Sequence, residues 1–184
     1  MRIFIDDFRR LRIESDQYIY QISIKDNQVN WLKNEGFNQF FVTEKDISLH
    51  QDDFITVNEQ TYPLEIGVVC LTKAFDERFR YDGKLGYDYT QDETTFRLFS
   101  PVAKEVYVVI EDERYPMQYD MPIWTATIHQ DLHLKPYHYD IRLVDTFKKV
   151  KDPYTVACST KDSYVIDWNQ LNPIDQSPIK LKNY

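Results

Sequence analysis

The sequence predicts an all-β protein that folds as two β-sandwich domains. Short runs rich in β-branched and aromatic residues recur along the chain and are separated by polar clusters. No run of about 12 residues combines helix caps with the i, i+3, i+4 and i+7 apolar spacing of an amphipathic helix. Hydrophobic residues make up 42% of the 184-residue chain, which is enough for a sizeable core and indicates a soluble folded protein.

The first 70 or so residues contain four runs with strand character. Residues 18–24 alternate between two faces with the two-residue period of a strand. Three further runs are rich in β-branched and aromatic residues, at 38–43, 54–57 and 66–71. These runs predict a first β-sandwich domain over residues 1–74.

The strand pattern is interrupted at residues 75–86, which hold two of the four glycines of the chain. We interpret this segment as a linker that folds back on itself. Five strand-like runs follow, at 95–99, 105–110, 123–128, 137–144 and 163–166. They predict a second sandwich over residues 75–170, followed by a linker at 171–184 in which residues 172–178 resemble a solvated strap.

One face of these five runs supplies a continuous apolar layer, which we expect to be the core of the second sandwich. Its expected members are Phe96, Leu98, Val106, Val108, Ile110, Trp124, Ala126, Ile128, Tyr139, Ile141 and Leu143.

Charge and length exclude several classes of function. The 22 Lys and Arg against 30 Asp and Glu give a formal charge of -8, which disfavours nucleic acid as a partner. No run approaches the roughly 20 apolar residues of a membrane-spanning helix, and the N-terminal segment has no signal-peptide core. Cys70 and Cys158 belong to no metal or redox motif, so we expect two buried or inert thiols and a cytoplasmic location.

The residues that could serve as catalytic groups or metal ligands are better explained by roles in strands and turns. Adjacent acidic residues, such as Asp6 and Asp7, point to opposite faces of a strand and do not form a general acid/base pair. His129, Asp131 and His133 have the spacing that places three ligands on one strand face, yet they fall at an expected turn. We therefore expect no catalytic residue, no metal and no cofactor.

Several segments together resemble the N-terminal region of type I pullulanases. The resemblance begins with residues 66–69, 75–79 (FDERF), 81–86 (YDGKLG) and 89–90. It continues through 95–106, which is similar to the first two strands of carbohydrate-binding module family 48, with Phe99 in place of the usual tryptophan. Residues 124–128, 131–133, 137–144, 152–154 (DPY), 165–167 and 172–173 extend it, so that it covers roughly residues 66–180.

The resemblance implies an immunoglobulin-like second domain, preceded by the extra N-terminal β-domain of cytoplasmic-type pullulanases. In this family a catalytic barrel of glycoside hydrolase family 13 follows these domains. A barrel takes about 250 residues, so the 184-residue chain has no room for a complete one and is expected to be inactive alone. The whole enzyme would hydrolyse α-1,6 linkages in glycogen, starch or pullulan.

The resemblance also places sugar-contacting residues. Phe147 and Lys149 fall where binding members of the family carry an aromatic and a basic residue on the sugar-facing loop, with Phe147 replacing the usual tryptophan. Trp124 and Tyr154 are further candidates for contacts with maltooligosaccharide, although the strand pattern favours a core position for Trp124. Trp31 and Trp168 are candidates of the same standing as Tyr154.

Two interpretations remain open. The chain is an accessory module that binds α-glucan, or its domains only support the catalytic barrel, with an apolar surface that mediates self-association when the barrel is absent.

Overall fold

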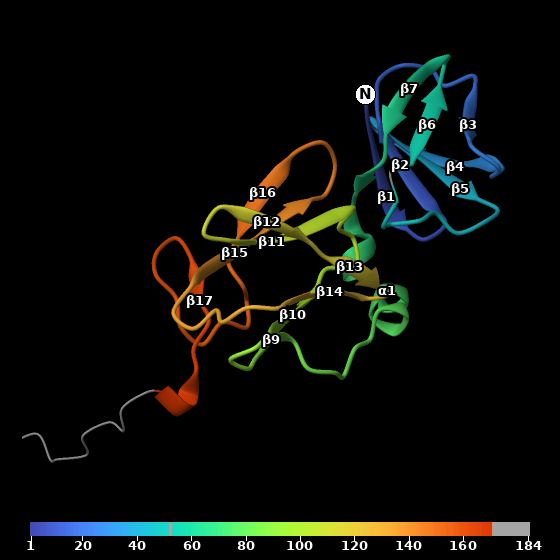
Figure 1. Ribbon diagram of the computed structural model, residues 1–184. Coiled ribbons are helices and arrows are strands. Elements are labelled where there is room, and N and C mark those ends of the chain that lie inside the picture. The colour runs from blue at the N-terminus through green and yellow to red at the C-terminus, as the bar shows by residue number, and fades with distance from the viewer. Residues whose placement is uncertain (52, 171–184) are drawn as a thin grey trace, which may run out of the picture.

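The computed structural model describes residues 1–51 and 53–170, and the predicted linker at 171–184 lies outside them. Figure 1 shows two groups of strands placed end to end, with the helix α1 beside the point where they meet. Each group encloses its own hydrophobic cluster. The fold is all-β, as the sequence predicts; we call the two groups the first and second parts.

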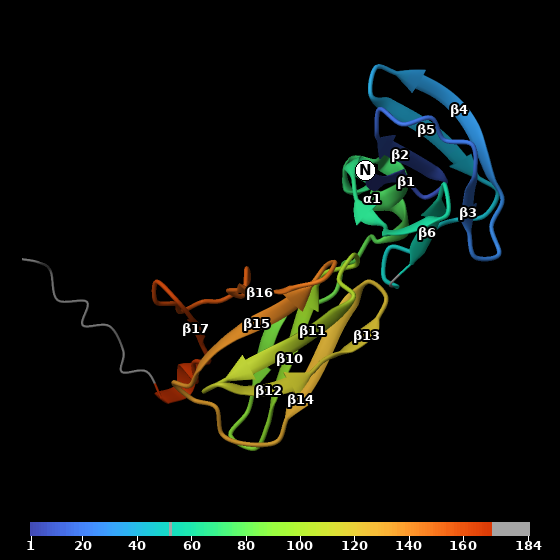
Figure 2. The same ribbon diagram turned by 90° about the horizontal axis from the view of Figure 1, so that it is seen from above.

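The first part consists of two sheets. Its strands are β1 (Arg2–Asp7), β2 (Arg10–Glu14), β3 (Ile22–Ile24), β4 (Val29–Glu35), β5 (Asn38–Thr43), β6 (Phe54–Val57), β7 (Gln60–Pro63) and β8 (Glu65–Ile66). The larger sheet has the order β4-β5-β2-β1-β8, in which only β8 runs parallel to its neighbour. The smaller sheet has the order β3-β6-β7. Figure 2 shows the larger sheet curving around the outside of this part.

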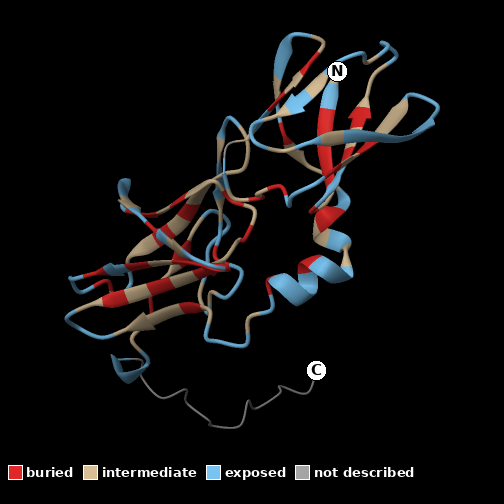
Figure 3. Ribbon diagram, turned by 90° about the vertical axis from the view of Figure 1, so that its right-hand side faces the viewer, coloured by how far each residue is buried: buried red, intermediate tan, exposed pale blue. Residues whose placement is uncertain are grey.

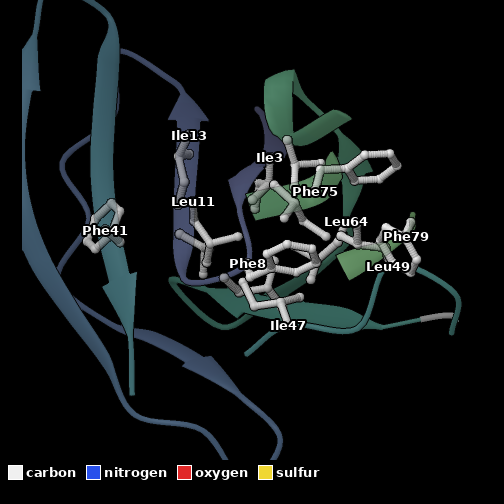
Figure 4. Close-up of a cluster of buried hydrophobic side chains, with 14 residues drawn as sticks. Ile3, Phe8, Leu11, Ile13, Phe41, Ile47, Leu49, Leu64, Phe75 and Phe79 are labelled. Carbon is white, nitrogen blue, oxygen red and sulfur yellow. The ribbon is translucent and has the colours of Figure 1, made fainter. Parts of the chain in front are cut away.

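The core of the first part lies between these sheets and extends into the helix that follows. Leu11 and Ile13 alternate along β2 and point to the same side, as Figure 4 shows. Phe75 and Phe79 belong to the same cluster, although they lie beyond the expected end of the first domain at residue 74. The predicted domain bounds, 1–74 and 75–170, stay a prediction.

The second part is a sandwich of two antiparallel sheets. Its strands are β9 (Gly86–Tyr89), β10 (Thr94–Phe99), β11 (Glu105–Ile110), β12 (Glu113–Pro116), β13 (Gln118–Asp120), β14 (Ile123–Ile128), β15 (Pro136–Arg142), β16 (Phe147–Val150) and β17 (Ser163–Tyr164). One sheet has the order β13-β14-β10-β9. The other has the order β12-β11-β15-β16, with β17 also paired to β15. A short turn, η2 (Trp168–Gln170), closes the described chain.

The inner faces of these two sheets form the core that the sequence predicts. Nine of the eleven expected residues are buried in one cluster, and Ile141 and Leu143 pack against it partly buried. Figure 3 shows buried residues alternating with others along these strands. The expected strands at 105–110 and 123–128 coincide with β11 and β14, because every second side chain along them belongs to the core cluster.

Other local predictions were wrong. The run at 66–71 is not one strand, because β8 ends at Ile66 and a 3-10 helix, η1 (Val68–Leu71), follows. Within 18–24 only β3 is a strand. The side chains of Tyr18 and Tyr20 are exposed, so neither one adds apolar burial that would favour a longer strand. Part of the supposed linker is the helix α1 (Lys73–Arg78). Cys158 is exposed, so of the two expected states, buried or inert, only the second stays open for this thiol.

His50 joins the two parts. It lies between β5 and β6 of the first part, yet its Nδ1 lies 2.8 Å from the carbonyl oxygen of Ala103 in the second. Its ring stacks on Tyr119 with centroids 3.9 Å apart and lies tilted against Trp124 at 5.3 Å. Phe99 of β10 also packs against the first cluster. The two parts therefore share a contact surface of aromatic rings.

Candidate functional site at the junction

A pocket of about 310 Å³ lies where α1, the segment before β9 and the second sandwich meet. Its lining is mostly aromatic: Phe75, Asp76, Phe79, Arg80, Tyr81, Leu85, Phe99 and Tyr154. These residues come from three segments far apart in the sequence, and each is a segment that carries the resemblance to pullulanases. Concave, largely apolar pockets with a few polar groups are typical ligand sites, especially at the junction of two folded units. We call this cavity the junction pocket.

The helix α1 contributes one wall of the junction pocket. Its N-terminus is capped by Thr72, whose Oγ1 accepts a hydrogen bond from the Phe75 amide at 3.1 Å. Phe75 and Phe79 are four residues apart and share a helix face, with ring centroids 4.7 Å apart. The cap and the ring contact fix this aromatic wall.

Two glycines lie directly against the tyrosines of the opposite wall. A Cβ on Gly83 would fall 2.3 Å from the hydroxyl oxygen of Tyr81, so any other residue there would shift that ring from its present position. Gly86 has a φ of +83°, and a Cβ there would lie 3.1 Å from the Cβ of Tyr154. The glycines of the YDGKLG segment therefore position two rings of the junction pocket.

A buried carboxylate also fixes the backbone of Tyr154 by a hydrogen bond. Its backbone amide donates to Oδ1 of Asp152 at 2.8 Å. Oδ2 of Asp152 accepts hydrogen bonds from the hydroxyls of Tyr137 and Tyr139 at 2.8 and 3.3 Å. The Tyr154 side chain, by contrast, is 46% exposed. A rigid backbone thus presents an accessible ring.

The polar groups of the junction pocket stand at its rim. Asp76 is exposed on α1, and Arg80 forms an exposed ion pair with Asp82 at 3.2 Å. Phe75 and Phe79 are themselves buried, so the accessible rings of the pocket are those of Tyr81, Phe99 and Tyr154, with hydrogen-bonding groups beside them. Such an arrangement suits a ligand with both an apolar face and hydroxyls, as a sugar ring has.

Phe147 and Lys149 lie elsewhere, on the outer face of the β12-β11-β15-β16 sheet. They are two residues apart on β16 and so share that face. The guanidinium of Arg114 lies 4.9 Å from the Phe147 ring centroid, and Tyr107 meets the same ring edge-on. Lys149 forms an ion pair with Asp162 at 2.8 Å. Both candidate side chains are already engaged by protein neighbours.

Trp124 occupies a third place, inside the core. It is only 4% exposed, and its Nε1 donates to the carbonyl oxygen of Ser100 at 2.9 Å. A sugar cannot stack on a ring that the protein encloses, so Trp124 is corrected from a candidate contact to a core residue. The structure therefore does not bring the four candidates together, and only Tyr154 lines the junction pocket.

Sequence reasoning missed the other lining residues of the junction pocket. Phe75 and Phe79 fall in the supposed linker, although their four-residue spacing after a threonine cap is a short-helix signal. Gly83 and Gly86 are the second available signal, because closely spaced glycines mark close approach of other groups.

The candidate metal ligands are occupied by separate hydrogen bonds. His129 pairs with Glu93 at 3.0 Å, and Asp131 accepts from the amide of His133 at 2.9 Å. His133 Nδ1 accepts from the amide of Asp167 at 2.9 Å. Within residues 1–51 and 53–170, no group of three or more His, Cys, Asp or Glu is arranged to hold a metal ion. No helix in that part of the chain is long and apolar enough to span a membrane.

Comparison with known proteins finds relatives by sequence. Residues 84–155 match carbohydrate-binding module 48, the isoamylase N-terminal domain. A pullulanase of Bacillus subtilis (strain 168) is 32% identical over 100 residues, which are 51% of this chain and 14% of that protein.

Solved structures extend the likeness over nearly the whole chain. Pullulanase from Anoxybacillus sp. LM18-11 in complex with maltotetraose superposes with a TM-score of 0.85 at 23% identity, over 96% of this chain and 28% of that one. Pullulanase from Paenibacillus barengoltzii in complex with maltohexaose and α-cyclodextrin is 32% identical over 58% of this chain and 18% of that one, with a TM-score of 0.53. The chain thus spans less than a third of the length of these relatives.

The second part is therefore a β-sandwich similar to the domains of a carbohydrate-binding module family. Residues 84–155 match carbohydrate-binding module 48, and the fold of nearly the whole chain is similar to that of a part of the solved pullulanases.

Proposed function

We propose that this chain is the α-glucan-binding, non-catalytic N-terminal region of a pullulanase-type enzyme that hydrolyses α-1,6 linkages, and that the junction pocket holds the glucan. The observation that carries the proposal is the convergence of three family-typical segments on one aromatic pocket. The ligand would be glycogen, starch or maltooligosaccharide. The catalytic barrel of the parent enzyme would be the partner, and the cytoplasm the location.

The chemistry of the pocket supports a sugar over other ligands. An aromatic face buries the C–H face of a glucose ring, and the net charge of -8 disfavours polyanions. Tyr81 and Tyr154 add hydroxyls, and Asp76 and Arg80 add charged hydrogen-bonding groups at the rim. These are the groups that a polyhydroxylated ligand needs.

A second candidate function is purely structural. Leu71 is 85% exposed on η1, directly before the helix that lines the junction pocket, and Val68 is also exposed. A catalytic barrel or a second copy of the chain would cover this apolar surface. In that case the domains orient the barrel and bind no glucan.

The test is calorimetric titration of the chain with maltoheptaose and with a branched glucan, with a pullulan-hydrolysis blank to exclude contaminating enzyme. We expect saturable heat and at least tenfold weaker binding in Tyr154→Ala, because losing a stacked ring costs about 1.4 kcal/mol or more. Tyr18→Ala, which removes an exposed tyrosine of the first part, is the matched control and should bind like the wild type.

Each other outcome overturns part of the proposal. No heat at millimolar sugar would overturn glucan binding and leave the structural role. Weakening by Phe147→Ala, with Tyr154→Ala unchanged, would move the site to the outer sheet face where Phe147 lies.

A further inference from the structure

A second pocket, of about 220 Å³, lies beside the turn η2. The residues that matter in it are Lys84, Tyr87, Asp88, Asp167, Trp168 and Asn169. Trp168 is 64% exposed, an unusual state for the largest side chain on an ordered turn. Lys84 lines this pocket while its neighbour Leu85 lines the junction pocket, so one short segment borders both.

Hydrogen bonds fix the backbone that carries Trp168. The amide of Ile166 donates to the hydroxyl oxygen of Tyr87 at 2.9 Å, and the amide of Asp167 donates to Nδ1 of His133 at 2.9 Å. Oδ1 of Asp167 then accepts the amide of Asn169 at 2.9 Å, which closes the turn on both sides of the tryptophan. The exposed ring is therefore presented by a fixed backbone, which lowers the entropy lost on binding.

The polar groups around Trp168 are arranged for a neutral ligand. Asp88 is neutralised by Lys84 and by Nη1 of Arg97, the latter at 2.6 Å. Hydrogen bonds from Asn169 and Gln170 lower the pKa of Asp167, which keeps this carboxylate ionised as an acceptor. Lys84 and Arg97 balance the charge of the two carboxylates, and an ammonium, an amide and carboxylate oxygens can all hydrogen-bond hydroxyls.

We propose that Trp168, with Lys84, Asp88 and Asn169, forms a second α-glucan subsite, separate from the junction pocket. Trp168 supplies the surface on which a glucose ring stacks, and the other three groups bind its hydroxyls. This inference rests on the proposed function, since it takes the ligand of both sites to be α-glucan.

Tryptophan fluorescence tests the subsite directly, because the chain has only three tryptophans. In a Trp31→Phe background the remaining ones are Trp168 and Trp124, and Trp124 is buried. We expect maltotriose to shift the emission and to protect the chain from acrylamide quenching. Both effects should disappear in Trp31→Phe/Trp168→Phe, which assigns the signal.

Calorimetry with maltotriose then counts the sites. We expect two binding events in the wild type, and at least tenfold weaker binding at one of them in Trp168→Ala. Trp31→Ala, which removes another exposed tryptophan, should retain both. An unchanged far-ultraviolet circular dichroism spectrum and thermal midpoint establish that Trp168→Ala is folded, as its exposed position leads us to expect.

The outcomes separate the two proposals. Heat in the wild type that Trp168→Ala leaves unchanged, with no fluorescence response, overturns the Trp168 subsite alone. A Trp168 response that persists in Tyr154→Ala, with unchanged total heat, overturns only the junction pocket. The absence of both heat and fluorescence response overturns glucan binding itself.

Discussion

The hydrophobic clusters of the two parts differ in whether their buried side chains carry hydrogen-bonding groups. The buried members of the first cluster are isoleucine, leucine, valine and phenylalanine only. The second cluster includes Tyr137 and Tyr139, both fully buried, with their hydroxyls directed to Asp152. The first part keeps its buried carboxylate, Asp6, outside this cluster and paired with Arg12 at 2.8 Å, whereas the second part has a polar network within its core that must stay satisfied.

The network of the second part connects its core to its surface. Burial and the nearby charge of Asp152 raise the pKa of both Tyr137 and Tyr139, so these hydroxyls remain protonated donors. The backbone amide of Asp152 donates to Oγ of buried Ser163 at 3.1 Å. The same carboxylate accepts the amide of Tyr154, so the exposed ring of the junction pocket depends on the core beneath it.

The largest expected effect comes from breaking that network. Asp152→Ala leaves two buried hydroxyls without their acceptor, which we expect to destabilise the second part by about 3 kcal/mol. Urea unfolding followed by hydrogen–deuterium exchange measures the two parts separately. The first part should keep its protection, because the hydrogen bonds of Asp152 described above all go to residues of the second part.

The control for this prediction is Asp120→Ala, which removes an exposed carboxylate from β13 of the same sandwich. It should change the stability by less than about 0.5 kcal/mol. Equal losses in both parts on Asp152→Ala would show that the network does not belong to the second part alone.

A smaller effect is expected from disturbing the shape of the first part. A Cβ on Gly67 would lie 2.2 Å from Oδ1 of Asp6 and 2.8 Å from the carbonyl oxygen of Ile5. Gly67→Ala must therefore push β8 away from β1, and we expect about 2 kcal/mol of destabilisation confined to the first part. The same exchange experiment should show faster exchange in β1 and β8.

Gly36→Ala provides the contrast. Gly36 has a φ of +61°, but a Cβ on it would have no other atom within 4 Å, so its replacement costs only the left-handed conformation, about 1 kcal/mol. If Gly36→Ala costs as much as Gly67→Ala, close packing at Gly67 is not what holds β8 against β1.

The same contrast explains how much of the fold the sequence predicts. In the second part, β11 and β14 have one face in the core, so a two-residue period locates them. In the first part, β1 buries Ile3, Phe4 and Ile5 in succession, because the guanidiniums of Arg2 and Arg12 cover Phe4 on the outer side. β4 is exposed almost throughout, so neither strand shows an alternating pattern.

The candidate site is harder to predict than the fold. Tyr154 can be identified because an aromatic residue in a family-typical segment is visible in the sequence. Its neighbours Phe75 and Phe99 lie 79 and 55 positions away, and only the packing of α1 against the second part brings them together. Phe147 shows the opposite problem, since the sequence does not reveal that Arg114 lies over its ring.

The smallest expected effect is a pH dependence that also separates the two parts. His138 lies on the outer face of the second part, and its side chain is only 13% exposed. Burial, and then the charge of Lys149, lower the pKa of His138 from 6.5, against the opposing effects of Asp140, Asp162 and Asp112. The folded second part therefore binds a proton at this site less readily than the unfolded chain does.

The sign of the effect follows from that lowered pKa. The stabilisation is fully present above the unfolded pKa of 6.5 and is lost as the pH falls through the folded value, so the second part should weaken below pH 6.5. His138→Gln should reduce this loss, while His129→Gln, at an exposed histidine, should leave it unchanged. Urea midpoints at pH 7.5 and 5.5 measure it. A loss of the same size in His138→Gln would show that other groups set the acid sensitivity of this sandwich, because no other change in the variant removes a proton-binding site.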